Sequence, residues 1–303
     1  MPHLRTSLAA LAWSGLGAAY ALATALSHEL VSDVYLAAAQ WIGPGLADRA
    51  QNILALLALA AGAWLVAGPG RRNGRLAGRE ALAWLILAAL LAAADRLLII
   101  APVERVHYPQ YAILALLLRR VLADEALVLV LGGMAGMADE LRQYLAHPAN
   151  TAYLDWNDFC LNLLGVATGL LLARLLAVRS LAGPRAAARV RAALLILVGL
   201  LAGAAALAWA GGRLIPYAPA AGALTAFPRV AGKPCFVLSF FHVAGFWNVA
   251  ATGRSCHVLT PGEGPVVLLL LFAVLAGVLA WSRKNGRPGS PQAPRPVAAT
   301  QKA

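Results

Sequence analysis

Ionisable and aromatic side chains recur at helical spacing between residues 104 and 165, in an otherwise apolar part of the chain. Residues three or four positions apart lie on one face of a helix. The sets with this spacing are Glu104 with His107 (or Tyr108) and Tyr111, Asp139 or Glu140 with Gln143, and Asp158 with Asn162 and Gly165. A carboxylate beside an imidazole can exchange protons or bind a polar ligand, so these sets predict a functional site.

Carboxylate and imidazole groups are also ligands for Mg²⁺, Mn²⁺ or Zn²⁺. The sequence has no His-x-x-x-His and no Cys-x-x-Cys spacing of the kind found in many zinc sites, so we expect no metal and no cofactor. Cys160 lies two residues from Asp158 and therefore on nearly the opposite helix face. We expect it to pack in the core rather than to act as a nucleophile.

The elements that carry these side chains are predicted to be membrane helices. The chain is 61% hydrophobic and only 13% charged, with a mean hydropathy of +0.71, whereas soluble domains are about 25% charged. We therefore expect an all-α, polytopic transmembrane helical bundle. About eight spans are predicted, at 8–26, 51–67, 81–101, 107–122, 126–145, 158–178, 191–210 and 265–281. The first could instead be a signal peptide that is cleaved near Ala23-Thr24-Ala25.

The distribution of Lys and Arg predicts the orientation of the bundle. With the N-terminus inside, most basic residues fall in cytoplasmic segments, including the clusters at 71–79 and 174–191. We therefore expect a multi-pass membrane protein with both termini cytoplasmic. The net charge of +12 then reflects topology and attraction to anionic membrane lipids, and we expect no nucleic-acid partner. The oligomeric state is left open.

The fifth predicted span places acidic side chains inside the membrane. Its apolar run, 126–138, has 13 residues and covers about 20 Å. A hydrocarbon core about 30 Å thick then puts Asp139 and Glu140 roughly 10 Å below its outer edge. Carboxylates at that depth are costly unless they are paired or hydrated, so we expect a polar cavity. The two are adjacent and point in different directions, and we expect only one of them to enter it.

The order and spacing of these residues resemble the pattern of the VanZ-like membrane proteins. That pattern is a charged residue before an aromatic pair, then Glu-x-x-Gln, then Asp-x-x-x-Asn-x-x-Gly. Its counterparts here are Glu104, His107, Tyr108 and Tyr111, then Glu140 and Gln143, then Asp158, Asn162 and Gly165. The resemblance covers residues 104–165. It implies an integral protein of the bacterial envelope, with a prototype linked to teicoplanin resistance, and it favours Glu140 over Asp139 in the cavity.

One departure from the VanZ-like pattern concerns an arginine. Many members carry an Arg between the Gln and the last Asp, but the loop at 147–150 has none. If that Arg binds an anion in relatives, Arg105 or Arg142 would have to do so here. The expected pocket residues are Glu104, Arg105, His107, Tyr108, Tyr111, Asp139, Glu140, Gln143, Asp155, Asp158 and Asn162. The alternative is a buried polar network that only holds the helices together.

The chain divides into six segments. These are 1–103 with three spans, the VanZ-like core at 104–180 with three spans, a seventh span within 181–210, an extracytoplasmic segment at 211–264, an eighth span at 265–281, and a disordered cytoplasmic tail at 282–303. The extracytoplasmic segment has strand-like runs that predict a small β-hairpin or sheet. On the oxidising side of the membrane, Cys235 and Cys256 are expected to form a disulfide. Glycines at 132, 133 and 136 predict close helix packing.

Three functions are compatible with this sequence. The first is an envelope protein that binds a lipid-linked or glycopeptide ligand in an outward-facing polar pocket. The second is an intramembrane enzyme for a lipid-linked substrate, with Glu140 and His107 as an acid–base pair and Asp158 as a further catalytic candidate. The third is a proton-coupled transporter, which the lack of an internal repeat disfavours.

Overall fold

The computed structural model describes the continuous stretches 2–43, 78–146, 155–178, 255–260 and 262–283, together with scattered residues between 45 and 57 and between 180 and 249. Its helices are α1 (Pro2–Ile42), α3 (Arg79–Leu97), the 3-10 helix η1 (Pro102–Val106), α4 (His107–Val121), α5 (Glu125–Ala146), α6 (Trp156–Leu175) and α8 (Glu263–Arg283). Over these residues the predicted all-α class is confirmed. The spans predicted at 51–67 and 191–210 lie largely outside the described residues.

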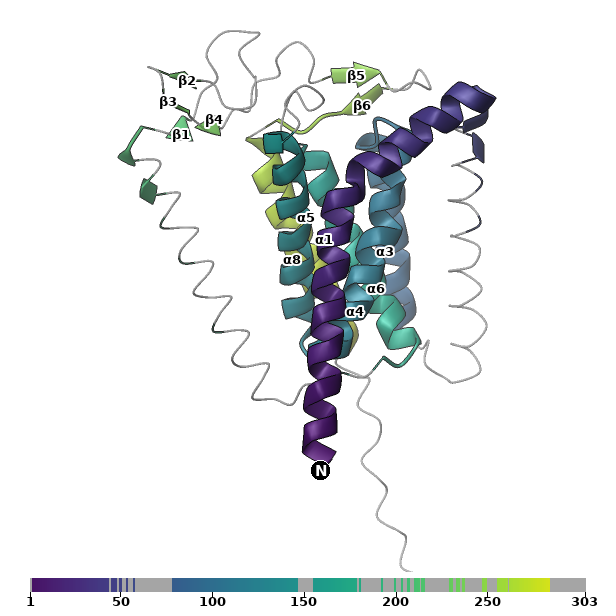
Figure 1. Cartoon of the computed structure of the whole chain (residues 1–303), viewed down its shortest axis with the longest axis vertical. Helices are drawn as coiled ribbons and strands as arrows, with labels where there is room; N and C mark the ends of the chain where they lie inside the picture. Colours follow the sequence, from purple (N-terminus) through teal and green to yellow (C-terminus); the bar gives the residue numbers. More distant parts are fainter. Residues whose placement is uncertain are drawn as a thin grey trace, which may run out of the picture.

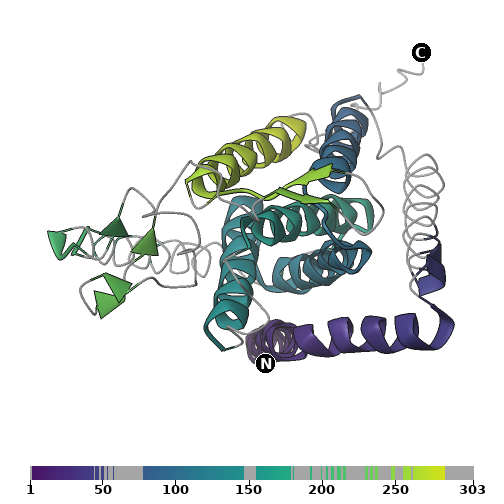
Figure 2. The same ribbon diagram turned by 90° about the horizontal axis from the view of Figure 1, so that it is seen from above.

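Helix α6 forms the centre of the bundle. Figures 1 and 2 show α3, α4, α5 and α8 arranged around it, and almost every α6 side chain is buried. By length and apolar composition, α6 and α8 are the two helices among the described residues that could cross a bilayer. Helix α6 is mostly buried, whereas only a small share of the residues of α8 is buried. Five of the predicted spans coincide with α3, α4, α5, α6 and α8 to within a few residues.

The first helix extends beyond the span predicted within it. The span was expected at 8–26, but α1 has 41 residues, a length of about 60 Å. No glycine or proline interrupts the sequence between residues 18 and 42, and the helix ends at Gly43, which has a φ of 83°. The helix is therefore longer than a hydrocarbon core about 30 Å thick requires. The upper part of α1 turns away from the bundle (Figure 1).

Glycines bring α4 and α5 close to α6. On α5, a Cβ at Gly132 would lie 2.5 Å from a methyl of Val166, and one at Gly136 would lie 2.8 Å from the amide nitrogen of Asn162. The close packing predicted for these α5 glycines is confirmed. On α6, a Cβ at Gly165 would lie 2.9 Å from the carbonyl oxygen of His107. Each of these positions therefore excludes a larger side chain, and the backbones approach closely.

Short strands form the segment before α8. Strand β1 (Leu214–Ile215) pairs in parallel with β4 (Phe236–Val237), and β2 (Arg229–Val230) pairs antiparallel with β3 (Lys233–Pro234). Strand β5 (Trp247–Val249) forms an antiparallel pair with β6 (Ser255–His257), in which Asn248 faces Cys256. Pairing of this kind was predicted for 211–264. Cys256 is buried, but Cys235 lies outside the described residues, so the disulfide stays a prediction.

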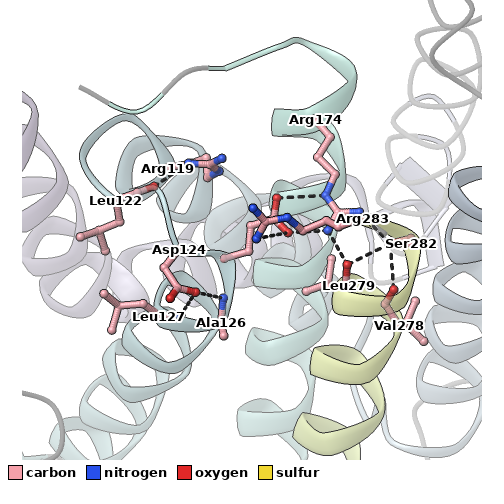
Figure 3. Close-up of polar contacts among 11 residues, drawn as sticks. Arg119, Leu122, Asp124, Ala126, Leu127, Arg174, Val278, Leu279, Ser282 and Arg283 are labelled. Atoms are coloured by element: carbon pink, nitrogen blue, oxygen red, sulfur yellow. Dashed lines mark hydrogen bonds and ion pairs between the residues drawn. The ribbon is translucent and has the colours of Figure 1, made fainter. Parts of the chain in front are cut away.

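A polar cluster connects α5, α6 and α8 (Figure 3). It lies at the C-terminal ends of α6 and α8, away from β5 and β6 (Figure 1). The guanidinium of Arg174 on α6 donates to both carboxylate oxygens of the buried Glu125 on α5. The same group donates to the Ser282 hydroxyl (2.7 Å) and to the Leu279 carbonyl (2.7 Å) on α8. Because these partners satisfy Arg174 from two neighbouring helices, we interpret this cluster as structural.

Candidate functional site

The first two turns of α6 present two polar side chains, Asp158 and Asn162, to the interior of the bundle. Asp155 is the N-cap of α6, and its carboxylate accepts a hydrogen bond from the Asn157 amide nitrogen (2.9 Å). This cap begins the helix so that Asp158 and Asn162, four residues apart, share one face. Asp158 is 7% exposed and Asn162 is 0% exposed.

Side chains from α4 and α5 meet this face. His107 is the first residue of α4, is 1% exposed, and has its Nε2 atom 3.4 Å from Oδ2 of Asp158. Glu140, near the end of α5, is 2% exposed. One nitrogen or oxygen atom from each of His107, Glu140 and Asp158 lies within 4.8 Å of the other two. The structure thus brings together an imidazole and two carboxylates from three helices, and we call these three residues the triad.

Several polar atoms around the triad are buried without a hydrogen bond. Oδ1 of Asp158 and the Tyr108 hydroxyl have no hydrogen-bond partner among the residues that the structure describes. Both polar atoms of the Asn162 amide also lack a hydrogen bond of good geometry within this part of the chain, although the amide lies beside His107. Buried polar atoms in folded proteins nearly always have a partner. Several such atoms close together could bind a polar group that enters the site.

Asp139 and Glu140 have different neighbours. Asp139 accepts a hydrogen bond from the Tyr111 hydroxyl (3.0 Å), and both residues are buried. Glu140 accepts one from the Gln143 amide (3.1 Å) and joins the triad. The expected residue, Glu140, is therefore the one placed with His107 and Asp158. The Tyr111–Asp139 bond links α4 to α5 beside the triad.

Two expected pocket residues are held by local structure. The carboxylate of Glu104 accepts hydrogen bonds from the backbone nitrogens of Ile100 (2.8 Å) and Ala101 (3.0 Å), which caps η1. The guanidinium of Arg105 pairs with Asp95 of α3, with Nε 2.5 Å from Oδ1. Arg142 lies partly exposed on α5. Arg105 therefore has an acidic partner already, which makes it a weak substitute for the arginine of the VanZ-like pattern.

The carboxylates at the end of the bundle interact electrostatically. Burial, followed by repulsion from Asp158 and Asp155, raises the pKa of Glu104 well above its ordinary value. Burial, followed by repulsion from Asp158, raises the pKa of Asp155 to about 7. Asp155 therefore carries less than its full negative charge near neutral pH. Burial is the largest cause for both groups, and a bound cation or proton would relieve the repulsion among acidic side chains that adds to it.

Asn157, which the sequence did not single out, attaches the segment before α8 to the site. Its amide nitrogen donates to the carbonyl oxygens of Leu98 (2.8 Å) and His257 (2.8 Å), and its oxygen accepts from the Leu259 nitrogen (3.0 Å). Residues 258–260 are buried, and Figure 2 shows β6 crossing above the bundle. This segment therefore covers the end of the bundle near the triad.

Hydrogen bonds at the start of α8 also hold residues 257–260 in place over the end of the bundle. Thr260 and Glu263 form a capping box, in which each side chain accepts a hydrogen bond from the other's backbone nitrogen (3.2 and 3.0 Å). The Glu263 carboxylate also contacts Nε2 of His257 (3.0 Å). A Cβ at Gly264 would lie 2.1 Å from the ring of Trp156, so α8 begins directly against the first residue of α6. The Thr-x-x-Glu pattern was the sequence signal for this feature.

The chain was compared with protein-family models, with curated proteins and with solved structures. None of the three comparisons gave a match. The resemblance to the VanZ-like proteins therefore depends on the residues between 104 and 165 alone.

Proposed function

We propose that this chain is a VanZ-like integral protein of the bacterial inner membrane that binds the polar part of a lipid-linked or glycopeptide ligand. The observation that carries the proposal is the triad, in which atoms of His107, Glu140 and Asp158 lie within 4.8 Å of one another. Buried polar atoms of Asn162 and Tyr108 that have no hydrogen-bond partner among the described residues lie nearby. A pocket with aromatic, amide and carboxylate groups suits a sugar or peptide headgroup.

The surface of the bundle supports placement in a membrane. Large apolar side chains are exposed on several helices, including Leu22 on α1, Leu85 on α3 and Leu269 on α8, each at least 60% exposed. Such a surface would be unfavourable in water and favourable against lipid tails. We infer about eight spans from this surface and from the hydropathy of the sequence.

The charges at the two ends support an outward-facing site. Arg119, Arg174 and Arg283 lie in the last turns of α4, α6 and α8. Helix α4 begins at the triad and ends at this basic region, and α6 runs in the same direction. Because arginines mark the cytoplasmic end of membrane helices, we infer that the triad faces the opposite, outer side.

The alternative function is an intramembrane enzyme for a lipid-linked substrate, which the closeness of Glu140 and His107 favours. Glu140 and His107 lie close enough to exchange a proton through a bound group. Cys160 is buried, and a buried thiol in apolar surroundings is a poor nucleophile. A reaction at this site would therefore use a nucleophile supplied by water or by the substrate.

The proposal is tested with purified protein in lipid nanodiscs. Binding of teicoplanin and of a polyprenyl-diphosphate sugar is measured by microscale thermophoresis, in buffer with EDTA. We expect one of the two to bind, and Asp158→Leu to weaken its affinity about ten-fold, as expected for loss of a buried hydrogen-bond partner. Glu140→Gln retains the shape and hydrogen bonding of the site, so binding of a neutral headgroup should persist.

The control is Asp33→Asn, which removes a carboxylate on α1 far along the chain from the triad and should leave binding unchanged. Wild-type protein that binds neither ligand above the level of protein-free nanodiscs would contradict the proposal. The enzyme alternative predicts instead that the wild type converts the sugar diphosphate and that Glu140→Gln abolishes turnover.

A further inference from the structure

We propose that the triad is a binding site for one divalent transition-metal cation, of the Zn²⁺ or Mn²⁺ type. His107 supplies an imidazole nitrogen, and Glu140 and Asp158 each supply a carboxylate oxygen. The inference goes beyond the proposed function, because a polar headgroup can bind to this pocket without an ion. It also differs from the expectation of no metal, which was based on the absence of ligand pairs closely spaced in the sequence.

The distances fit an ion after a small adjustment. Zinc is usually tetrahedral and binds imidazole nitrogen and carboxylate oxygen at about 2.0–2.2 Å, so its ligand atoms lie about 3.4 Å apart. The three atoms of the triad lie within 4.8 Å of one another. A difference of at most about 1.4 Å is within the reach of side-chain rotation.

The charges in the triad also favour a cation. Glu140 and Asp158 are buried carboxylates, and two negative charges this close repel each other in a medium of low dielectric constant. A dication between them replaces this repulsion with attraction. The neighbouring carboxylates Asp139 and Asp155 add to the negative potential, and the imidazole of His107 is the basic group that directly faces Asp158.

An independent observation comes from Asn162. Its side chain is fully buried beside His107, and neither its oxygen nor its nitrogen has a hydrogen bond of good geometry within the described residues. Oδ1 of Asp158 is likewise buried without a hydrogen-bond partner in that part of the chain. An amide oxygen is a suitable additional ligand, either directly or through a water molecule. The Asn162 oxygen could therefore complete the coordination.

Gln143 supports one of the proposed ligands, Glu140. The Gln143 amide donates to Oε1 of Glu140, which orients that carboxylate and leaves Oε2 for the ion. Hydrogen bonds of this kind to ligating carboxylates are typical of metal sites. The combination of one imidazole with carboxylates favours Zn²⁺ or Mn²⁺ over Ca²⁺, which prefers oxygen ligands alone.

The test uses full-length protein without a histidine tag, in detergent, after dialysis against EDTA. Zn²⁺ or Mn²⁺ alone is then added, and bound metal is measured by mass spectrometry of the desalted protein and by calorimetry. We expect one ion per chain. Asp158→Asn and His107→Gln should each weaken binding by at least ten-fold.

The matched control is Asp139→Asn. It removes a carboxylate that is equally buried, on the same helix turn as Glu140, but that bonds to Tyr111. Asp139 adds to the negative potential but supplies no ligand atom to the triad, so this variant should weaken binding by no more than about three-fold, clearly less than Asp158→Asn. Thermal unfolding of each metal-free variant establishes that it is folded before binding is compared.

A spectroscopic readout distinguishes coordination from loose attraction. Pulsed EPR of the Mn²⁺-loaded protein should show a directly bound nitrogen that disappears in His107→Gln. Less than one-tenth of an ion per wild-type chain would overturn the proposal, as would equal binding by wild type and Asp158→Asn. Failure here leaves the ligand-binding test unaffected, since that experiment is performed in EDTA.

Discussion

At the scale of single residues, the function proposed here depends on a small number of buried polar side chains. His107, Glu140 and Asp158 lie on three different helices, yet their polar atoms come within 4.8 Å. Helical spacing in the sequence indicates which residues share a face of one helix. It cannot indicate which faces of different helices meet, because that depends on packing.

The choice between Asp139 and Glu140 illustrates this limit. Both carboxylates are buried at the same depth of the same helix. The preference for Glu140 came from the VanZ-like pattern, and the physical reason is visible only in the packed bundle, where Tyr111 donates to Asp139. Asn157 was not predicted at all, because its three partners lie 59 to 102 residues away.

Asn157 provides a prediction about stability. Asn157→Ala leaves two carbonyl oxygens and one backbone nitrogen near the site without their partner. We expect the free energy of unfolding to fall by about 3 kcal/mol, since each unsatisfied buried group costs about 1–3 kcal/mol. Unfolding in mixtures of SDS and mild detergent measures this change, and hydrogen exchange should increase at residues 256–260.

The control for Asn157 is Thr168→Val, because the Thr168 hydroxyl bonds only to a carbonyl of its own helix, that of Leu164, among the contacts that the structure gives. Its effect should stay below about 1 kcal/mol. Equal losses of unfolding free energy for the two substitutions would mean that Asn157 does not hold residues 256–260 against α6.

At the scale of elements, glycines set the distances between helices and so position the triad. Gly165 lies one turn after Asn162 on α6. A Cβ at this position would lie 2.8 Å from the Tyr108 carbonyl oxygen and 2.9 Å from that of His107. The first turn of α4, which carries His107, can therefore reach α6 only because residue 165 has no side chain.

Gly165→Ala consequently tests how the helices position the site. The added methyl pushes against the backbone of α4, so we expect destabilisation of about 1–3 kcal/mol. Gly277→Ala on α8 is the matched control, since a Cβ there meets no atom within 4 Å. Alanine is the better helix former by about 1 kcal/mol, so this control should be neutral or stabilising. Similar losses at both positions, measured by the same unfolding assay, would refute the packing argument.

Most helix positions could be predicted from the sequence, but their ends could not. Apolar length located α3, α4, α5, α6 and α8 because the hydrophobic runs between polar loops were clear. The first helix continued to Ile42, well beyond the predicted residue 26, because helix formation requires no membrane. The close packing of Gly132 and Gly136 was predictable from their four-residue spacing. Which helix they face was not.

At the scale of the whole molecule, polar groups concentrate at the two ends of the bundle. One end holds the triad under the segment before α8, and the other holds Arg174 bonded to Glu125, Ser282 and Leu279. The basic end is satisfied by its own partners, which suits a structural role. The acidic end has buried atoms without hydrogen bonds among the described residues, which suits binding.

Double-mutant cycles among the triad residues test the central claim most directly, namely that His107, Glu140 and Asp158 form one site. The substitutions are His107→Gln, Glu140→Gln and Asp158→Asn, singly and in pairs, with the free energy of unfolding as the measured quantity. Residues in contact show interaction energies of about 0.5–3 kcal/mol, whereas independent residues are additive within about 0.5 kcal/mol. The account predicts an interaction energy above 0.5 kcal/mol for every pair. Additivity for all three pairs would contradict it.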